Sequence, residues 1–324
     1  MSLQELSKHY AAGKLAKPDF INRMHELHKA LFEYADYIKE TDVDSITIEN
    51  GRLFLTVKKS GIKMFLDRQD KRFIPIEMLN FHTIDPQERD LLAKIMPDQA
   101  SVFDIGANIG WYTLNFAAMP KVKRIHSFEP VPYTYSYLKK HLELNCVRNV
   151  TPFNFGFSDK CEKVSFYWTK NETGSASVRN IQNRSRIDRV TCKLSTMDSF
   201  MRGKRLPIDF IKCDVEGSEL FVFKGAVETL KKCKPIIYTE LLRKWSMKFG
   251  YHPNDVMELL GGLGYFCFGF VEGKIKPIQI MGDDLQTTNF FFLHGDKHRE
   301  IIRSLGRLTS QTNGVDIKSL HDDG

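Results

Sequence analysis

The sequence predicts an α/β protein built on a doubly wound, mostly parallel sheet with an antiparallel last strand. From about residue 100 onward, short apolar runs alternate with helix-like segments, a pattern typical of parallel strands covered by helices on both faces. A glycine-containing bend follows the first of these runs. The chain of 324 residues is 42% hydrophobic and 27% charged, which fits one principal domain with a smaller accessory region.

The N-terminal part is predicted to form a helix and a β-hairpin. Apolar residues recur at helical spacing over residues 18–40. Ile46 and Ile48 then alternate with polar residues, and Asn50-Gly51 is a preferred two-residue hairpin turn. A short helix over residues 86–95 leads into the main domain. We expect an accessory region at residues 1–85, a main domain at 86–296, and a C-terminal helix and tail at 297–324.

The main domain is predicted as five strands, four of them followed by a helix, and a closing strand pair. The expected strands are residues 101–105, 125–128, 150–155, 208–213, 235–238, 265–270 and 289–293. The expected helices are residues 111–119, 132–145, 219–231 and 254–263, and a hairpin-rich insertion follows the third strand. Because no helix separates the last two strands, that edge of the sheet is expected to be antiparallel.

Composition narrows the class of protein. No run of eighteen or more apolar residues occurs, so we expect no membrane span. Scattered cysteines and an N-terminus without a basic-then-apolar pattern indicate a cytoplasmic protein with reduced thiols. The net charge of +7 is spread out, which disfavours a nucleic-acid groove. One arginine-rich stretch could still meet an anionic substrate: Arg179, Arg184, Arg186 and Arg189.

The bend after the first strand is the predicted cofactor site. Gly106 and Gly110 permit a tight turn before a helix N-terminus, and Glu129, after the second strand, could accept hydrogen bonds from a ribose diol. The dinucleotide fingerprint G-x-G-x-x-G is absent, since Asn108 replaces its second glycine. Asp104 at the strand end would repel a pyrophosphate but suit a cofactor that carries an ammonium and a sulfonium group. This favours S-adenosylmethionine over a nicotinamide cofactor.

Three blocks, in this order, resemble the FkbM family of methyltransferases: residues 104–114 (DIGANIGWYTL), residues 128–130 (FEP) and residues 212–219 (KCDVEGSE). The resemblance extends from about residue 85 to the segment 289–292, with Cys213 where an aliphatic residue is usual. It implies a class I methyltransferase fold of seven strands, the seventh antiparallel, with S-adenosylmethionine as donor and mostly O-methylation of sugars or secondary metabolites. It also implies that Phe157, Ser158 and Asp159, after the third strand, flank the adenine.

The cofactor-binding residues expected from the bend and the resemblance form one set. They are Asp104, Gly106, Ala107, Asn108, Gly110, Trp111, Thr113, Glu129, Pro130, Phe157, Ser158 and Asp214.

A second acidic cluster follows the fourth and fifth strands. Asp214, Glu216 and Glu240 are the candidate catalytic residues, because removing the proton of an alcohol acceptor requires a positioned base. Glu219 is better explained as an acid in the first turn of a helix, and Glu216 has the same alternative explanation. A divalent cation held by Asp214, Glu216 and Glu240 remains open, although we expect no metal.

Other polar and aromatic residues are weighed in the same way. His126 is expected to be a hydrogen-bonded core residue, and His252 a residue at a helix start with a smaller chance of acting on the acceptor. The polar loop 171–177 is expected to border the acceptor. Trp111, Tyr167 and Trp168 could stack on a sugar face, with core packing as the alternative.

The leading hypothesis is an S-adenosylmethionine-dependent O-methyltransferase for a small-molecule or glycosidic acceptor. The alternatives are a catalytically silent cofactor-binding module with an assembly or regulatory role, and a nicotinamide-dependent oxidoreductase. Residues 1–85 are candidates for capping the site or for mediating a homodimer.

Overall fold

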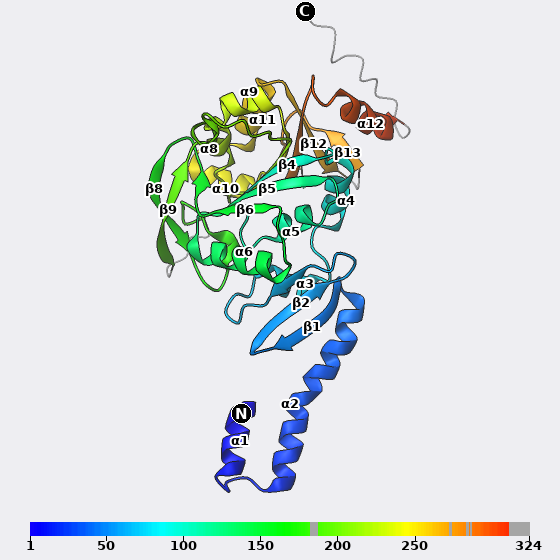
Figure 1. The fold of residues 1–324 in the computed structure, drawn as a ribbon, viewed down its shortest axis with the longest axis vertical. Coiled ribbons are helices and arrows are strands. Elements are labelled where there is room, and N and C mark those ends of the chain that lie inside the picture. The colour runs from blue at the N-terminus through cyan, green and yellow to red at the C-terminus, as the bar shows by residue number, and fades with distance from the viewer. Residues whose placement is uncertain (182–186, 272–273, 283–284, 286, 311–324) are drawn as a thin grey trace, which may run out of the picture. The chain divides into compact units, whose positions relative to one another are not determined.

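A computed structural model describes residues 1–181, 187–271, 274–282, 285 and 287–310 (Figure 1). The chain forms two compact units. The small unit comprises Met1–Leu66 and Ile74–Ile84, and the large unit comprises Asp67–Phe73 and the chain from Asp85 onward. The chain passes from the small unit to the large unit for the last time between Ile84 and Asp85. The short segment Asp67–Phe73, by contrast, belongs to the large unit.

The small unit contains three α-helices, a short 3-10 helix and a three-stranded sheet. Its helices are α1 (Leu3–Ala11), α2 (Lys17–Tyr37), η1 (Ile38–Glu40) and α3 (Ile74–Phe81), and its strands are β1 (Val43–Glu49), β2 (Arg52–Val57) and β3 (Lys63–Phe65). Glu49 pairs with Arg52, and Asn50 and Gly51 between them have φ angles of 50° and 71°. This is the predicted hairpin, because a two-residue turn of this type needs positive φ at both positions.

Helix α1 was not predicted, although the sequence carries a signal for it. Ser2 and Glu5 form a reciprocal capping box at its start, a pattern that marks helix N-termini. Tyr10 of α1 stacks on Phe20 of α2 with ring centroids 4.4 Å apart. The two helices therefore form an antiparallel hairpin.

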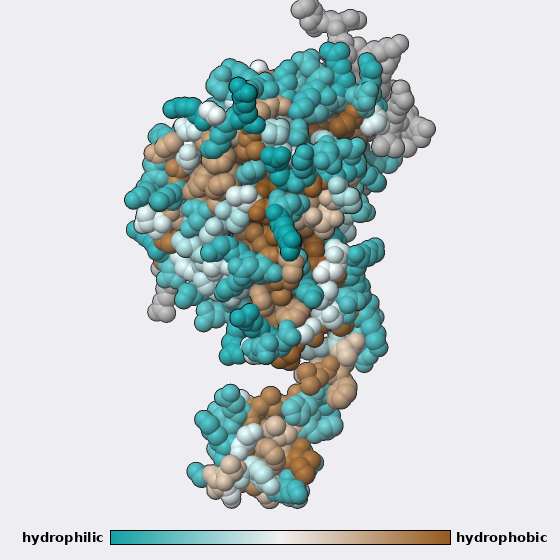
Figure 2. All heavy atoms as spheres, viewed as in Figure 1, coloured by the Kyte–Doolittle hydropathy of each residue, from teal (hydrophilic) through white to brown (hydrophobic). Residues whose placement is uncertain are grey.

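Helix α2 exposes apolar residues along much of its length. Among the described residues it carries no buried side chain, and Ile21, Leu27, Leu31 and Phe32 are all exposed. Figure 2 shows these helices with hydrophobic residues at their surface. Homodimerisation through residues 1–85 stays a prediction.

The large unit is built on an eight-stranded sheet in the order β13-β12-β14-β11-β10-β4-β5-β6. The strands are β4 (Ala100–Ile105), β5 (Val122–Phe128), β6 (Val150–Phe153), β10 (Phe210–Cys213), β11 (Ile236–Glu240), β12 (Tyr265–Val271), β13 (Lys274–Pro277) and β14 (Asn289–His294). Strands β6, β5, β4, β10 and β11 are parallel neighbours, whereas β14 runs antiparallel to both β11 and β12. The doubly wound, mostly parallel sheet with an antiparallel last strand is confirmed.

The sheet has one strand more than expected. Strand β13 adds to the seven predicted strands as an antiparallel partner of β12. Its sequence, Lys274-Ile275-Lys276-Pro277, is short and contains two lysines, and it forms a strand by pairing with β12. Local pattern alone could not reveal this strand.

Helices cover both faces of this sheet. They are α4 (Pro86–Ile95), α5 (Trp111–Ala117), α6 (Pro132–Leu144), α7 (Met197–Met201), α8 (Glu219–Lys224), α9 (Val227–Cys233), α10 (Arg243–Ser246), η3 (Met247–Phe249), α11 (Pro253–Gly261) and α12 (Arg299–Ser310). None of the helices in the described part of the chain is both long and apolar enough to cross a membrane.

The predicted helix over residues 219–231 is in fact two helices, α8 and α9. Helix α8 ends at Gly225, where a Cβ atom would lie 2.0 Å from the carbonyl oxygen of Ser158. Only glycine permits this close approach of two backbones. The break results from a contact between distant segments, which helical periodicity does not encode.

The hairpin-rich insertion forms a second sheet in the order β7-β9-β8, with β7 (Gly156–Phe157), β8 (Glu162–Trp168) and β9 (Asp188–Ser195). A short 3-10 helix, η2 (Thr173–Ser175), lies in the loop between β8 and β9.

Successive side chains of the central strands point to opposite faces of the sheet, so the core has two layers. Phe103 and Ile211 pack with α8, α9 and α11 on one face, whereas Val102 and Phe210 pack with α4, α5 and α12 on the other. By the two-residue period of a strand, Asp104 and Lys212 must lie on the second face. This placement decides the electrostatics of the site.

Candidate active site

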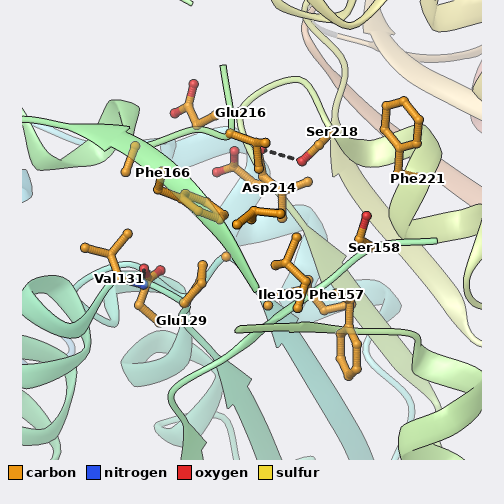
Figure 3. Close-up of a pocket in the computed structure, with 18 of the residues that line it drawn as sticks. Ile105, Glu129, Val131, Phe157, Ser158, Phe166, Asp214, Glu216, Ser218 and Phe221 are labelled. Atoms are coloured by element: carbon orange, nitrogen blue, oxygen red, sulfur yellow. Dashed lines mark hydrogen bonds between the residues drawn. The ribbon is translucent and has the colours of Figure 1, made fainter. Parts of the chain in front are cut away.

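A pocket of about 290 Å³ opens at the carboxyl ends of β4, β5 and β10 (Figure 3), where ligands bind in open α/β sheets. Its polar lining combines Glu129, Asp214 and Glu216 with the glycine bend. The full lining is Ile105, Gly106, Asn108, Glu129, Pro130, Val131, Gly156, Phe157, Ser158, Asp159, Lys160, Glu162, Val164, Phe166, Thr173, Gly174, Ala176, Val178, Arg179, Leu194, Asp214, Val215, Glu216, Ser218, Phe221 and Phe249.

The glycine bend is fixed by backbone contacts on both sides. The amides of Gly106 and Ala107 both donate to the carbonyl oxygen of Phe128 at 3.0 Å. Gly106 has a φ of 76°, and a Cβ atom there would lie 1.8 Å from the carbonyl oxygen of Asp214. Glycine is therefore required here, and the bend is locked to the start of the acidic loop.

Asn108 continues the bend into the pocket. Its φ of 49° lies in the left-handed region, which asparagine tolerates better than most residues. Its amide donates to Glu129 Oε2 at 2.8 Å. Its side-chain Oδ1 is buried and has no hydrogen-bond partner among the described residues. An unsatisfied acceptor that lines a pocket fits a ligand bearing an ammonium or amide donor.

Glu129 is a buried carboxylate with capacity left for a ligand. Its Oε1 accepts from the amide of Val131 at 2.9 Å and from the hydroxyl of Thr134 at 2.8 Å, and its Oε2 accepts from Asn108. A carboxylate offers about four acceptor positions, so one remains for a ligand hydroxyl. Burial raises the pKa of Glu129, against the lowering effect of these hydrogen bonds.

Asp104 lies beneath the bend and not in the pocket lining. It is fully buried, accepts a 2.5 Å hydrogen bond from Thr113 Oγ1, and lies 3.7 Å from the ammonium of Lys212. Lys212 also lies 3.3 Å from Asp214 Oδ2 and donates to the carbonyl oxygen of Gly106 at 3.0 Å. Burial raises the pKa of Asp104 although the Lys212 charge opposes it.

This geometry corrects the electrostatic argument made from the sequence. Lys212 stays protonated, because the carboxylates of Asp214 and Asp104 raise its pKa more strongly than burial lowers it. The charge of Asp104 is thus balanced inside the protein and does not face a ligand. The carboxyl groups that do line the pocket belong to Glu129, Asp159, Glu162, Asp214 and Glu216.

Three more of the expected cofactor residues support the bend from behind. Gly110, at the start of α5, has a φ of 96°. Trp111 and Thr113 are buried on the same helix, and neither appears in the pocket lining. Ala107 is also buried. Pro130, Phe157 and Ser158 line the pocket, and their contact with a cofactor stays a prediction.

The acidic loop after β10 presents two carboxylates to the pocket. Asp214 and Glu216 both line it, and Figure 3 shows them on the same side of the cavity. Glu216 has a φ of 54°, a costly backbone conformation for this residue type that persists where the surroundings enforce it. Burial, followed by the charges of Asp214 and Glu240, raises the pKa of Glu216.

Glu219 holds this loop in place. Its Oε1 accepts from the amides of Val215 and Gly217, both at 3.1 Å, and its Oε2 accepts from the hydroxyl of Tyr251 at 3.1 Å. Gly217, with a φ of 94°, leaves room for Trp245, since a Cβ atom there would lie 2.8 Å from Trp245 Cβ. Glu219 is therefore an architectural acid, and burial raises its pKa to about 7.

Glu240 ends β11 behind the acidic loop and is not in the pocket lining. Burial, followed by the charges of Asp214 and Glu219, raises its pKa to about 8. Among the described residues, no group of three or more His, Cys, Asp or Glu side chains has the geometry to hold a metal ion.

The two weighed histidines lie outside the pocket lining. His252 is the N-cap of α11, and its Nδ1 accepts from the amide of Asn254 at 3.2 Å. His126 stacks on Phe153, but its buried Nδ1 has no hydrogen-bond partner among the described residues. The expectation of a hydrogen-bonded core histidine was wrong in that respect, because aromatic rings surround it.

The loop 171–177 supplies Thr173, Gly174 and Ala176 to the pocket lining. The aromatic residues proposed to stack on a sugar do not line it. Trp168 packs on Tyr133 with centroids 5.3 Å apart, and Tyr167 lies under the Arg189 guanidinium.

Besides Phe157, the aromatic residues that line the pocket are Phe166, Phe221 and Phe249. These residues come from three distant segments, so no local motif could have marked them. Lys160 and Arg179 also line the pocket, with Arg179 over the Phe249 ring at 5.7 Å. Arg184 and Arg186 of the arginine-rich stretch lie outside the described residues.

Comparison with known proteins finds a matching family model and several relatives. Residues 104–267 match the family model described as the methyltransferase FkbM domain. The chain is 25% identical over 177 residues to the hexuronic acid methyltransferase AglP of Haloferax volcanii, covering 53% of this chain and 67% of that protein. It is 30% identical over 148 residues to Methyltransferase 1 of Beauveria bassiana, covering 40% of this chain and 59% of the relative.

Among solved structures, a methyltransferase FkbM from Methylobacillus flagellatus has a similar fold. The matched region covers 66% of this chain and 52% of that chain. The sequence identity is 18% and the TM-score is 0.39.

Proposed function

The chain belongs to the FkbM family of methyltransferases, and on that premise we propose that it is an S-adenosylmethionine-dependent O-methyltransferase for a hydroxyl group of a sugar, a glycan or a secondary metabolite. The observation that carries the proposal is the presence of Glu129, Asp214 and Glu216 in one pocket beside the glycine bend. One carboxylate can hold the donor there, and two can act on the acceptor.

The residues fit the donor. S-adenosylmethionine supplies a methyl group on a sulfonium centre, together with a ribose diol, an adenine and an ammonium group. Glu129 has an acceptor position left for a ribose hydroxyl, and the orphaned Asn108 Oδ1 suits an ammonium donor. Phe157 offers an apolar surface next to Ser158 for the adenine.

The residues of the acidic loop fit an alcohol acceptor. Glu216, whose pKa is raised by burial and by neighbouring carboxylates, is our candidate for the base that takes the hydroxyl proton. A base works best when its pKa is near the working pH. Asp214 accepts a hydrogen bond from the acceptor and aligns its oxygen, and Glu240 raises the pKa of Glu216 through its charge.

The remaining walls favour a polyhydroxylated ring. Carboxylates accept hydrogen bonds from hydroxyl groups, and Phe166, Phe221 and Phe249 offer apolar surfaces to the C–H faces of a sugar. Lys160 and Arg179 could meet an acidic substituent. The relative AglP, described as a hexuronic acid methyltransferase, supports a sugar acceptor.

The test begins with calorimetric titration of the full chain with S-adenosylmethionine and S-adenosylhomocysteine. Methyl transfer is then measured on p-nitrophenyl β-glucopyranoside and p-nitrophenyl β-glucuronide, and the position of the new methyl group is found by mass spectrometry. We expect binding of both cofactor forms and a methyl ether on a ring hydroxyl. The variant Asp214→Asn should lose turnover more than donor affinity.

Three outcomes would contradict the proposal. Binding of both cofactor forms without transfer to any acceptor would favour the catalytically silent module. A methyl ester on the glucuronide would exclude a hydroxyl acceptor for this substrate. Binding of NADH in place of S-adenosylmethionine would favour the oxidoreductase.

A further inference from the structure

The segment Asp67–Phe73 belongs to the large unit although the chain on both sides of it belongs to the small unit. It also lies outside residues 104–267, which match the family domain. Asp70 and Phe73 are almost completely buried, with 2% and 1% exposure. The contacts of these seven residues with the rest of the large unit must account for this burial.

Two aspartates of this segment share one arrangement. In each, one carboxylate oxygen holds the local turn: Asp67 Oδ1 accepts from the amides of Gln69 and Asp70, and Asp70 Oδ1 accepts from Arg72. The other oxygen of each reaches a distant part of the large unit. The segment is therefore a rigid clip with two outward contacts.

The first contact is to helix α6. Asp67 Oδ2 accepts from the hydroxyls of Tyr133 at 2.7 Å and Tyr137 at 2.5 Å. The Phe73 ring packs edge-on against Tyr137, with centroids 5.0 Å apart. Helix α6 follows Glu129 and Pro130 in the chain, so this contact anchors the clip to an element that adjoins the pocket.

The second contact is to the loop after β8. Asp70 Oδ2 accepts from the amide of Thr173 at 2.9 Å and from its hydroxyl at 2.5 Å. The amide of Lys71 donates to the carbonyl oxygen of Asn171 at 3.0 Å. Thr173 is 3% exposed and lines the pocket. Hydrogen bonds to a charged carboxylate are stronger than neutral ones, so this contact fixes one end of the loop.

The rest of the loop touches both halves of the site. A Cβ atom on Gly174 would lie 3.6 Å from Asn108 Nδ2, which is van der Waals distance from the donor bend. Ser177 is pinned to Tyr167 of β8 by two backbone hydrogen bonds, and its hydroxyl donates to the carbonyl oxygen of Glu216 at 3.1 Å. A path of contacts thus runs from Asp70 through Thr173 and Ser177 to Glu216.

We propose that Asp70 is a positioning residue, which holds the loop Thr173–Ser177 against Asn108 and the left-handed backbone of Glu216. By this route, the segment Asp67–Phe73 sets the acceptor side of the site. The positioning role rests on the proposed function, because it assumes methyl transfer to an acceptor in this pocket. That Asp70 holds the loop follows from the hydrogen bonds alone.

The experiment compares Asp70→Ala with a matched control, Asp198→Ala, in the full chain. Asp198 Oδ1 accepts from the amide of Thr229 at 2.8 Å and from its hydroxyl at 2.6 Å, which is the same kind of aspartate–threonine clamp. Neither Asp198 nor Thr229 lines the candidate active site. The control therefore reports the cost of losing such a clamp elsewhere in the large unit.

Hydrogen exchange measured by mass spectrometry tests the clip without any acceptor. We expect peptides covering residues 171–178 to exchange at least tenfold faster in Asp70→Ala than in the wild type or in Asp198→Ala. In the described part of the chain, the Asp70 side chain hydrogen-bonds to Arg72 and Thr173 and only its loop reaches Asn108, so the affinity for S-adenosylhomocysteine should change less than threefold. Should Asp70→Ala fail to fold, Thr173→Val removes only the hydroxyl bond, and Thr173→Ser restores it.

Steady-state kinetics with the p-nitrophenyl glycosides test the positioning role. We expect kcat/KM for the glycoside to fall at least tenfold in Asp70→Ala, with the KM for S-adenosylmethionine changed less than threefold. Thr173→Val should lie between this variant and the wild type, and Thr173→Ser, which keeps the hydroxyl, should recover most of the activity that Thr173→Val loses. Asp198→Ala should leave both constants unchanged.

Unchanged exchange in residues 171–178 of Asp70→Ala would show that the clip does not hold the loop. Faster exchange with an unaltered kcat/KM would overturn the positioning role. If the wild type methylates neither glycoside, the proposed acceptor class fails, and the exchange result alone decides the clip.

Discussion

Replacing Lys212 with methionine would leave a carboxylate charge stranded in the core. The side chain of Lys212 is 5% exposed and that of Asp104 is 0% exposed. Asp104 Oδ1, which lies 3.7 Å from the ammonium, has no hydrogen-bond partner among the described residues. Two unit charges about 4 Å apart attract by about 4 kcal/mol at an effective dielectric of about 20. Breaking a buried pair from one side costs about 3–5 kcal/mol.

We therefore expect Lys212→Met to lower the free energy of unfolding at pH 8 by about 3–5 kcal/mol. The loss should be smaller at pH 5. Burial already raises the pKa of Asp104, and without Lys212 the pKa rises further, so the folded variant holds a proton on Asp104 that the unfolded chain releases. Stability is then retained at low pH and lost as the pH rises through the folded-state pKa.

Urea unfolding at the two pH values measures this effect. Lys231→Met is the control, because Lys231 pairs with Glu228 on the surface at 3.2 Å with both side chains more than half exposed, and such pairs contribute about 0–1 kcal/mol. Adding Asp104→Asn to Lys212→Met should recover part of the loss. A loss below about 1 kcal/mol at pH 8, or equal losses at both pH values, would refute this account of the buried ion pair.

Three further predictions concern the pocket. Glu129→Gln should weaken S-adenosylhomocysteine binding at least tenfold by calorimetry, about 1.4 kcal/mol, since a carboxylate oxygen that accepts at the donor site becomes an amide. Gly106→Ala should lower methyl transfer at least a hundredfold, because its Cβ would lie 1.8 Å from a backbone oxygen after β10; Gly61→Ala, with a similar φ and open space, is the control in the same assay. The rate of methyl transfer should rise with pH as Glu216 loses its proton. Glu240→Gln should move that rise to lower pH, because it removes a charge that raises the pKa of Glu216. A pH–rate profile that does not move in Glu240→Gln would exclude this effect of Glu240 on Glu216.

Elements with strong local patterns were predictable from the sequence. The hairpin at Asn50-Gly51, helix α4 and the central strands were all found at or near the expected residues. Each has its own periodicity or turn dipeptide, so neighbours along the chain suffice to specify it.

Contacts between distant segments were not predictable in the same way. Gly225 breaks a helix because the Ser158 backbone approaches it, and Asp70 reaches Thr173 across more than a hundred residues. Lys212 did carry a signal, since it is the one charged residue within β10, Phe210–Cys213. A lysine on a buried strand requires a carboxylate partner, and that requirement could have pointed to Asp104.

The chain's three indoles are Trp111, Trp168 and Trp245; none lines the pocket, but each lies beside a different segment near it. Trp111 follows the glycine bend, Trp168 packs on Tyr133 near the clip, and Trp245 fills the space left by Gly217 in the acidic loop. Replacing two of them with phenylalanine would leave a single emitter. Intrinsic fluorescence could then report on one place at a time with no attached dye. Trp111 would report on the glycine bend, Trp168 on the surroundings of the segment Asp67–Phe73, and Trp245 on the acidic loop.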